Sequence, residues 1–142
     1  MRALFDVNAL IALFHRQHVH HDAAHAWLSV NLTSGWASCP LTQNGFVRIM
    51  SQPKFPGAIS SSAALELLRR AIAAGNHEFW CDDLSLADSA HFSGNGILAH
   101  HQVTDSYLLA LAASRGGRLV TFDRALSARA AIKAEAENLV IL

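Results

Sequence analysis

The sequence predicts an α/β fold, with residues 1–142 forming a single domain in which a mostly parallel central sheet is flanked by helices. Short apolar runs alternate with segments of helical periodicity, a pattern typical of βαβ units. The run at residues 139–142 is continuously apolar, as expected of a parallel strand covered on both faces. Hydrophobic residues make up 51% of the chain, which is enough to form a substantial core.

In the first half of the chain, apolar spacing and boundary residues predict each element. The predicted order is a strand at residues 3–5, a helix at 9–14, a helix at 22–30, a strand at 35–39 and a helix at 40–50. Asp22 is a suitable N-cap for the second of these. Pro53, Pro56 and Gly57 favour a loop after the helix at 40–50, because proline cannot continue a helix.

The second half follows the same rules. The predicted order is a helix at residues 64–72, a strand at 77–81, a short helix within 82–90, a flexible loop at 93–96, a helix at 104–115, a strand at 118–122, a short helix at 124–134 and a strand at 138–142. Gly116 and Gly117 end the helix at 104–115, because glycine adopts the left-handed backbone of a helix end at little cost.

Charge and composition limit the functional classes. The net charge is zero with histidine neutral, which argues against wrapping long nucleic acid by bulk charge but not against a nuclease with acidic metal ligands. No apolar run suits a membrane span and no signal-peptide pattern is present, so we expect a cytoplasmic protein. Cys39 and Cys81 form no metal motif and are expected to be buried thiols.

Three aspartates are candidates for one site at the edge of the sheet. Asp6 follows the first predicted strand, Asp123 follows the fourth, and Asp105 begins a helix. Ligands of open α/β sheets bind beyond the carboxyl ends of the strands. Taken alone, Asp105 could be an N-cap and Asp123 a turn residue, whereas Asp6 interrupts an apolar run, where an unpaired carboxylate is costly. We expect the three to converge.

Converging carboxylates repel one another and favour a bound cation. Mg²⁺, which Mn²⁺ can replace, prefers oxygen ligands. A water bound to such an ion is more acidic than free water, so it loses a proton readily and can then attack a phosphodiester. The ion also stabilises charge on the phosphate. The predicted chemistry is metal-dependent hydrolysis, with Asp6, Asp105 and Asp123 as ligands.

Three segments carry a resemblance to a known family. They are LFDVNALI at residues 4–11, TDSYLLALA at 104–112 and GRLVTFD at 117–123. In this order and at these separations, the chain resembles a PIN domain, and more narrowly the VapC-type toxins of bacterial toxin–antitoxin pairs. The resemblance implies a metal-dependent endoribonuclease that cleaves structured RNA, often transfer RNA, and forms a homodimer. It also implies inhibition by a VapB-like antitoxin that inserts a peptide near the metal site.

The chain departs from the family at the start of the third helix. Family members place a fourth acidic residue there, whereas this chain has Gln43 and Asn44. Either an amide replaces the acid and weakens one metal site, or another acid, such as Asp83 or Asp88, supplies it. We expect one tightly held metal. Asn44 is a candidate polar site residue, with an ordinary helix-start amide as the alternative.

Two further residues are candidates for supporting roles. Thr121 lies two positions before Asp123, so both side chains point to the same side of the strand. Its hydroxyl is expected to hold a carboxylate or a bound water. Asn8 is placed to support Asp6 from the first turn of the helix. Either residue could instead cap the backbone.

Five histidines lie between His15 and His25. His21 and His25 are four residues apart, a spacing found in Zn²⁺ pairs, but Asp22 stands where a metalloprotease motif has glutamate. The favoured interpretation is a polar loop and helix start that touches RNA or a partner.

Two other functions remain open. Haloacid-dehalogenase-like phosphatases also place an aspartate after the first strand, but they need a second one two residues later, where this chain has Asn8. A PIN-like chain with a catalytically weakened site would bind RNA or a partner without cleaving it. Binding of Mn²⁺ through the three aspartates without RNA cleavage would favour this second function.

Overall fold

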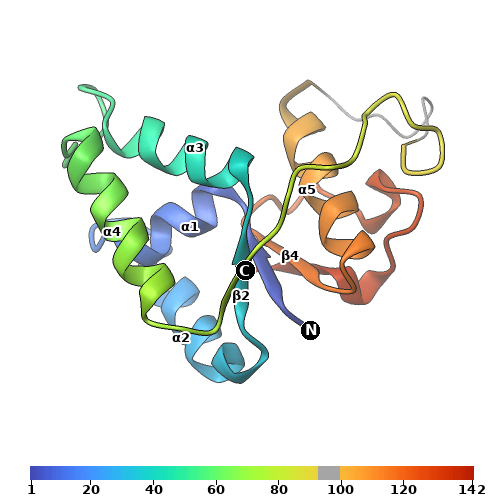
Figure 1. Ribbon diagram of the computed structural model, residues 1–142, viewed down its shortest axis with the longest axis horizontal. Coiled ribbons are helices and arrows are strands. Elements are labelled where there is room, and N and C mark those ends of the chain that lie inside the picture. The colour runs from blue at the N-terminus through green and yellow to red at the C-terminus, as the bar shows by residue number, and fades with distance from the viewer. Residues whose placement is uncertain (93–99) are drawn as a thin grey trace.

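The computed structural model describes residues 1–92 and 100–142, which form a parallel five-stranded sheet with helices on both sides (Figure 1). The strand order is β3-β2-β1-β4-β5, and every neighbouring pair is parallel. The strands are β1 (Ala3–Phe5), β2 (Trp36–Ser38), β3 (His77–Phe79), β4 (Arg118–Thr121) and β5 (Leu139–Ile141). The helices are α1 (Val7–Phe14), α2 (His21–Asn31), α3 (Pro40–Met50), α4 (Ser61–Ala73) and α5 (Val103–Ser114). The predicted α/β class is confirmed.

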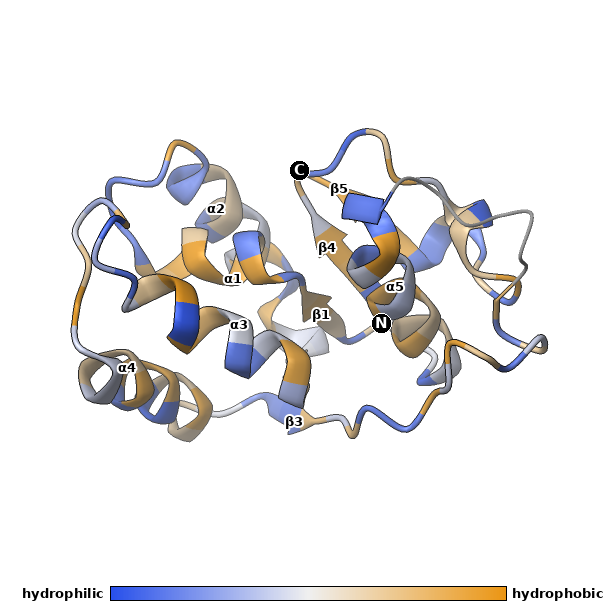
Figure 2. Cartoon of the chain, turned by 90° about the horizontal axis from the view of Figure 1, so that it is seen from above, coloured by the Kyte–Doolittle hydropathy of each residue, from blue (hydrophilic) through white to orange (hydrophobic). Residues whose placement is uncertain are grey.

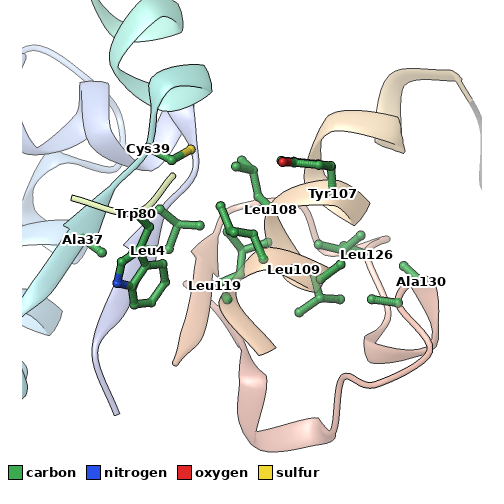
Figure 3. Close-up of a cluster of buried hydrophobic side chains, with 14 of the residues drawn as sticks. Leu4, Ala37, Cys39, Trp80, Tyr107, Leu108, Leu109, Leu119, Leu126 and Ala130 are labelled. Atoms are coloured by element: carbon green, nitrogen blue, oxygen red, sulfur yellow. The ribbon is translucent and has the colours of Figure 1, made fainter. Parts of the chain in front are cut away.

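Alternate residues of β1, β2, β4 and β5 supply two separate hydrophobic cores, because successive side chains of a strand point to opposite faces. Ala3 and Phe5 of β1 belong to the core beneath α1–α4, whereas Leu4 belongs to the core beneath α5. Figure 2 shows the sheet between these two groups of helices. On the α5 side, Leu4 and Leu119 of the sheet meet Leu108 of the helix (Figure 3). Each such fully buried leucine stabilises the fold by roughly 1.5–3 kcal/mol.

The pairing of β1 with β4 sets the geometry of the sheet edge. Leu4 lies opposite Leu119 and Phe5 opposite Val120. The backbone N–H of Asp6 continues this ladder by donating to the carbonyl of Val120 at 3.0 Å. Strand alternation therefore directs Asp6 to the same side as Leu4, toward α5.

Two predicted helices are absent from the described part of the chain. Residues 82–90 are irregular up to residue 85 and then form turns, and the 124–134 segment contains turns and only the 3₁₀ helix Ala128–Ala130. In the second case, three apolar side chains of the segment are buried in the α5 core: Leu126, Ala130 and Ala131. This packing outweighs the helix propensity of an alanine-rich segment, which is a weak determinant. The predicted flexible loop at 93–96 lies outside the described residues.

The two glycines after α5 serve different purposes. Gly116 has a positive φ of 62°, the left-handed helix end that was predicted. Gly117 instead permits close packing. A Cβ there would lie 2.5 Å from the ring of Trp80 and 2.8 Å from the carbonyl of Arg2. A side chain at residue 117 would therefore separate the start of β4 from its neighbours.

Two further expectations concern exposure. Cys39 is buried as expected, but Cys81 is exposed, because it follows β3 at the edge of the sheet. Among the described residues, no helix has both the length and the apolar character needed to cross a bilayer.

Candidate active site

The carboxyl edge of the sheet, where β1 and β4 lie side by side, carries the three aspartates singled out from the sequence. Asp6 directly follows β1 and is the N-cap of α1. Asp123 lies two residues beyond the end of β4. Asp105 is the third residue of α5, which packs against both strands. Three segments far apart in the sequence thus meet at one edge.

Asp6 is a buried carboxylate with 4% of its surface exposed. It accepts hydrogen bonds from the backbone N–H groups of Asn8 and Ala9 and from the hydroxyl of Thr121. Burial nevertheless raises the pKa of Asp6 above its ordinary value, because loss of water penalises the charged form more than these hydrogen bonds stabilise it. The negative charge of Asp123 acts in the same direction. A cation at this position would stabilise the ionised form.

Asp105 is electrostatically coupled to the other two aspartates. Burial, the largest cause, and the negative charges of Asp6 and Asp123 together raise the pKa of Asp105 from 3.8 to about 6. Asp105 therefore lies close enough to Asp6 and Asp123 for their charges to disfavour its ionisation.

Asp123 lies in a different environment, which favours its ionised form. The backbone N–H of Ala125 donates to Oδ1 at 2.8 Å, and the side-chain amide of Gln102 donates to Oδ2 at 3.2 Å. These hydrogen bonds, with that of Ala125 the larger contribution, lower the pKa of Asp123. Gln102 is itself buried, and its carbonyl accepts a hydrogen bond of 2.8 Å from the hydroxyl of Ser106.

Sequence reasoning missed Gln102. The signal available was its position three residues before Asp105, a spacing that places two side chains on the same face of a helix. Gln102 ends the 3₁₀ helix His100–Gln102 and is the N-cap residue of α5, so it lies at the same sheet edge as the three aspartates.

Thr121 links the ends of β1 and β4. Its fully buried hydroxyl accepts a hydrogen bond of 3.0 Å from the backbone N–H of Asp123 and is also hydrogen-bonded to Asp6. Asn8 contributes differently from the expectation. Its side chain is exposed, and its bond to Asp6 comes from the backbone N–H, which any residue except proline supplies.

The start of α3 carries amides in place of an acid. Gln43 donates from Nε2 to the hydroxyl of Ser38 at 2.9 Å, and this hydroxyl is paired with Nε2 of His77 at 2.8 Å. Asn44 is exposed and lines, with Arg48, a groove of about 480 Å³ between α3 and α4. In the described chain, the side chain of Asn44 makes no hydrogen bond to the three aspartates.

Neither of the expected substitute acids reaches this position. Asp83 forms an ion pair with Arg115, beyond the far end of α5. Asp88 binds a backbone N–H within its own turn. Asp82 instead lies at the start of α3, where it accepts a hydrogen bond of 2.9 Å from the N–H of Leu41. An acid from elsewhere in the chain is thus present at the start of α3, although it is not one of the two expected, and both alternatives stay open.

The donor set fits a hard divalent cation that keeps water ligands. Carboxylate oxygens are the ligands that Mg²⁺ and Mn²⁺ prefer, and mutual repulsion of the three aspartates favours a cation between them. Within residues 1–92 and 100–142, no three acidic, histidine or cysteine side chains lie close enough to enclose a metal. Mg²⁺ suits such an open arrangement, because one or two carboxylates usually bind it while waters and substrate phosphates complete its shell.

The histidine pair is part of the structure of α1. A ring nitrogen of His21 lies 2.7 Å from the carbonyl of Ala12, and one of His25 lies 2.7 Å from the carbonyl of Leu13. These carbonyls belong to the last turn of α1, where they have no partner within the helix. The two histidines therefore satisfy the end of α1, and nothing in their contacts supports a zinc site.

Comparison with known proteins gives an independent line of information. A family model described as PIN domain matches residues 3–132. Ribonuclease VapC44 of Mycobacterium tuberculosis strain H37Rv is 47% identical over 142 residues, the full length of both chains. Ribonuclease VapC38 of that strain is 48% identical over 122 residues, which cover 85% of this chain and 84% of the relative. Ribonuclease VapC39 is 43% identical over 128 residues, covering 89% and 92%.

Proposed function

The chain belongs to the PIN-domain family, among its VapC-type ribonuclease toxins, and on that premise we propose that it hydrolyses structured RNA with a divalent cation bound by Asp6, Asp105 and Asp123. The observation that supports this most directly is the placement of Asp6 and Asp123 after the adjacent strands β1 and β4, with Asp105 in the first turn of α5, which packs against both strands. Three carboxylates in mutual repulsion at a sheet edge are suited to a cation and poorly suited to remaining without one.

The chain's own residues would orient the carboxylates. When bound, the cation lowers the pKa of a water ligand and stabilises charge on the phosphate. Gln102 and the N–H of Ala125 hold both oxygens of Asp123. Thr121 ties the ends of the two strands together through Asp6 and the backbone of Asp123. This hydrolysis needs no serine or cysteine nucleophile.

The substrate and partners follow from the resemblance to VapC-type toxins. We propose transfer RNA as the substrate and a homodimer as the assembly. We also propose a VapB-like antitoxin as the inhibitor, with a peptide inserted near the three aspartates. Mg²⁺ is the proposed ion, with Mn²⁺ able to replace it, and the cytoplasm is the proposed location.

One observation favours a second candidate function. The start of α3 offers the amides Gln43 and Asn44 where the family places an acid, and Gln43 is held by Ser38. A site weakened in this way would bind RNA or a partner protein without cleavage.

Incubation of the purified chain with total transfer RNA and with duplex DNA distinguishes the two functions. We expect discrete RNA fragments with Mg²⁺ or Mn²⁺, intact RNA with EDTA and intact DNA throughout. RNA cleavage that persists in EDTA would contradict the proposed metal dependence. Binding of Mn²⁺ and RNA with no cleavage in any metal would favour the binding module.

A further inference from the structure

Three aromatic rings from two distant segments meet at the carboxyl end of β4. His18 and His20 lie in the loop between α1 and α2, and Phe122 directly follows β4. The ring of His20 stacks on Phe122, with centroids 4.2 Å apart and an interplanar angle of 22°. His18 stacks on Phe122 at 6.1 Å and 26°, and the two histidine rings lie 5.8 Å apart. We call these three side chains the ring cluster.

Core packing alone does not account for the ring cluster. Both histidines are only half-buried, and Val19 between them is 86% exposed, so the loop lies at the surface. Burial lowers the pKa of His18, and the neighbouring histidines, His20 first, lower it further. Partial burial of the polar His18 ring therefore costs free energy, a penalty that an apolar leucine side chain would not have there. The lowered pKa also favours an uncharged ring, which suits stacking better than binding phosphate.

The ring cluster adjoins the three aspartates through the backbone. Phe122 is covalently bonded to Asp123, and it packs against the core beneath α1–α4. Thr121, its other neighbour, holds Asp6 on the side of α5. The ring cluster and the carboxylates therefore lie on the two sides of one strand end. Because Phe122 and Asp123 are consecutive residues, an RNA strand that passes over the end of β4 from the carboxylates would reach the rings.

We propose that the ring cluster is a base-stacking subsite, in which an unstacked base beside the cleaved phosphate stacks on His18 and His20 with Phe122 behind them. This inference rests on the proposed ribonuclease function. Proteins that recognise RNA splay out bases of loops and single strands and stack them on aromatic side chains, histidine included. Such stacking occurs beside charged grooves that follow the backbone.

The histidine nitrogens provide hydrogen-bonding groups beside the proposed stacking surface. Nδ1 of His18 accepts a hydrogen bond of 3.2 Å from the backbone N–H of His20, which leaves Nε2 protonated as a donor in the neutral ring. The ring nitrogens of His20 have no hydrogen-bond partner among the described residues, so this ring offers one donor and one acceptor. These groups point outward in the plane of each ring, so a base stacked on the ring face leaves them free to pair with a neighbouring nucleotide.

The test uses a single-stranded RNA nonamer of mixed sequence that carries 2-aminopurine at each position in turn. Its binding is measured in Mg²⁺ by anisotropy and by quenching of the fluorescent base, in an Asp105→Asn background that leaves the RNA intact. The variants are His20→Ala, His20→Phe and, as a control in the same exposed loop, Gln17→Ala. Thermal melts verify that each variant is folded.

We expect His20→Ala to weaken binding about tenfold and to abolish quenching at one position, because loss of one stacked base has an effect of this order. His20→Phe should retain affinity and quenching, and Gln17→Ala should change neither. Equal losses in His20→Ala and His20→Phe, or no loss in either, would overturn the subsite. Cleavage of total transfer RNA by the wild-type chain is measured in parallel. If RNA binding depends on His20 but no RNA is cleaved, the nuclease function is refuted and the subsite remains. If RNA is cleaved but binding does not depend on His20, only the subsite is refuted.

Discussion

The side-chain amide of Gln102 donates a hydrogen bond of 3.2 Å to Oδ2 of Asp123. Gln102 is buried, and its backbone carbonyl is held by Ser106, so its side chain has little freedom to turn away. Groups that hold a metal-binding carboxylate by a hydrogen bond fix its orientation, and their loss usually weakens metal binding or activity. Asp123 thus depends on a residue that touches neither metal nor substrate in the proposed mechanism.

Substitution Gln102→Ala should lower Mn²⁺ affinity and the rate of RNA cleavage by roughly 10- to 100-fold, the usual effect of losing a residue that orients a ligand. The lost hydrogen bond also raises the pKa of Asp123 toward its ordinary value. The measurement is a Mn²⁺ titration followed by initial cleavage rates. Gln52→Ala, at an exposed position, is the control. Unchanged metal affinity in Gln102→Ala would show that Asp123 needs no such support.

Substitution Asp105→Asn should separate activity from stability. Activity should fall by more than about 100-fold, because loss of a ligand exceeds the loss caused by its supporting residues. Stability without metal should rise slightly at neutral pH, by about 1 kcal/mol after allowance for solvent screening, because a repelling charge is removed. Denaturant unfolding in EDTA measures this difference. A large loss of stability would mark Asp105 as a structural residue.

The same pair of proteins should differ in the pH dependence of unfolding. The pKa of Asp105 rises from 3.8 to about 6 on folding, so the folded protein binds this proton more tightly than the unfolded chain. The resulting stability is fully present below pH 3.8 and is lost as the pH rises to about 6. Asp105→Asn should lack this loss. Parallel curves for the two proteins between these pH values would contradict the raised pKa.

Divalent metal should stabilise the wild-type fold by mass action. At a free Mn²⁺ concentration of about 100 times Kd, the expected gain is about 2.7 kcal/mol, seen as a higher Tm. Asp6→Asn should lose most of this gain, whereas Asp22→Asn, at an exposed position of α2, should keep it. A wild-type Tm that does not respond to Mg²⁺ or Mn²⁺ would count against a metal site.

Substitution Gln43→Glu tests the departure at the start of α3. We expect a second, weaker Mn²⁺-binding event in calorimetry, because the added carboxylate supplies the acid that VapC-type toxins place there. Ser38, which now accepts a hydrogen bond from Gln43, can donate its hydroxyl proton to the new carboxylate. Asn44→Asp is the comparison, since Asn44 is exposed and, unlike Gln43, is not hydrogen-bonded to Ser38. An unchanged stoichiometry in Gln43→Glu would place residue 43 outside the metal site.

The order of the strands and long helices along the chain could be predicted, because local sequence patterns determine where each of these elements forms. Residues 139–142 were predicted as a strand from their continuous apolar run, and β5 occupies residues 139–141. The expected burial on both faces was wrong, because β5 is an edge strand whose side chains are half-buried or exposed. The 124–134 segment was predicted wrongly as a helix, because its structure depends on burial of Leu126 and Ala130 against α5, a contact that no local pattern reveals. Within residues 82–90 a turn and a short helix were expected; the turn is present and the helix is not.

The candidate site, too, could be predicted only in part. Asp6, Asp105 and Asp123 could be placed at one edge because parallel strands end together and helices begin there. The contacts between side chains could not be foreseen. Gln102 supports Asp123 through a short 3₁₀ helix, and Asn8 contributes only its backbone N–H. Such roles depend on the exact position and orientation of the side chain rather than on residue type.

The most direct test compares wild type with Asp6→Asn on total transfer RNA in Mg²⁺, in Mn²⁺ and in EDTA. Asparagine is as good an N-cap as aspartate, so α1 should remain intact while the charge is lost. The metal-dependent mechanism predicts discrete fragments from the wild type with either metal, none with EDTA and none from Asp6→Asn. Equal cleavage by folded Asp6→Asn would contradict the central claim that this carboxylate binds the catalytic ion.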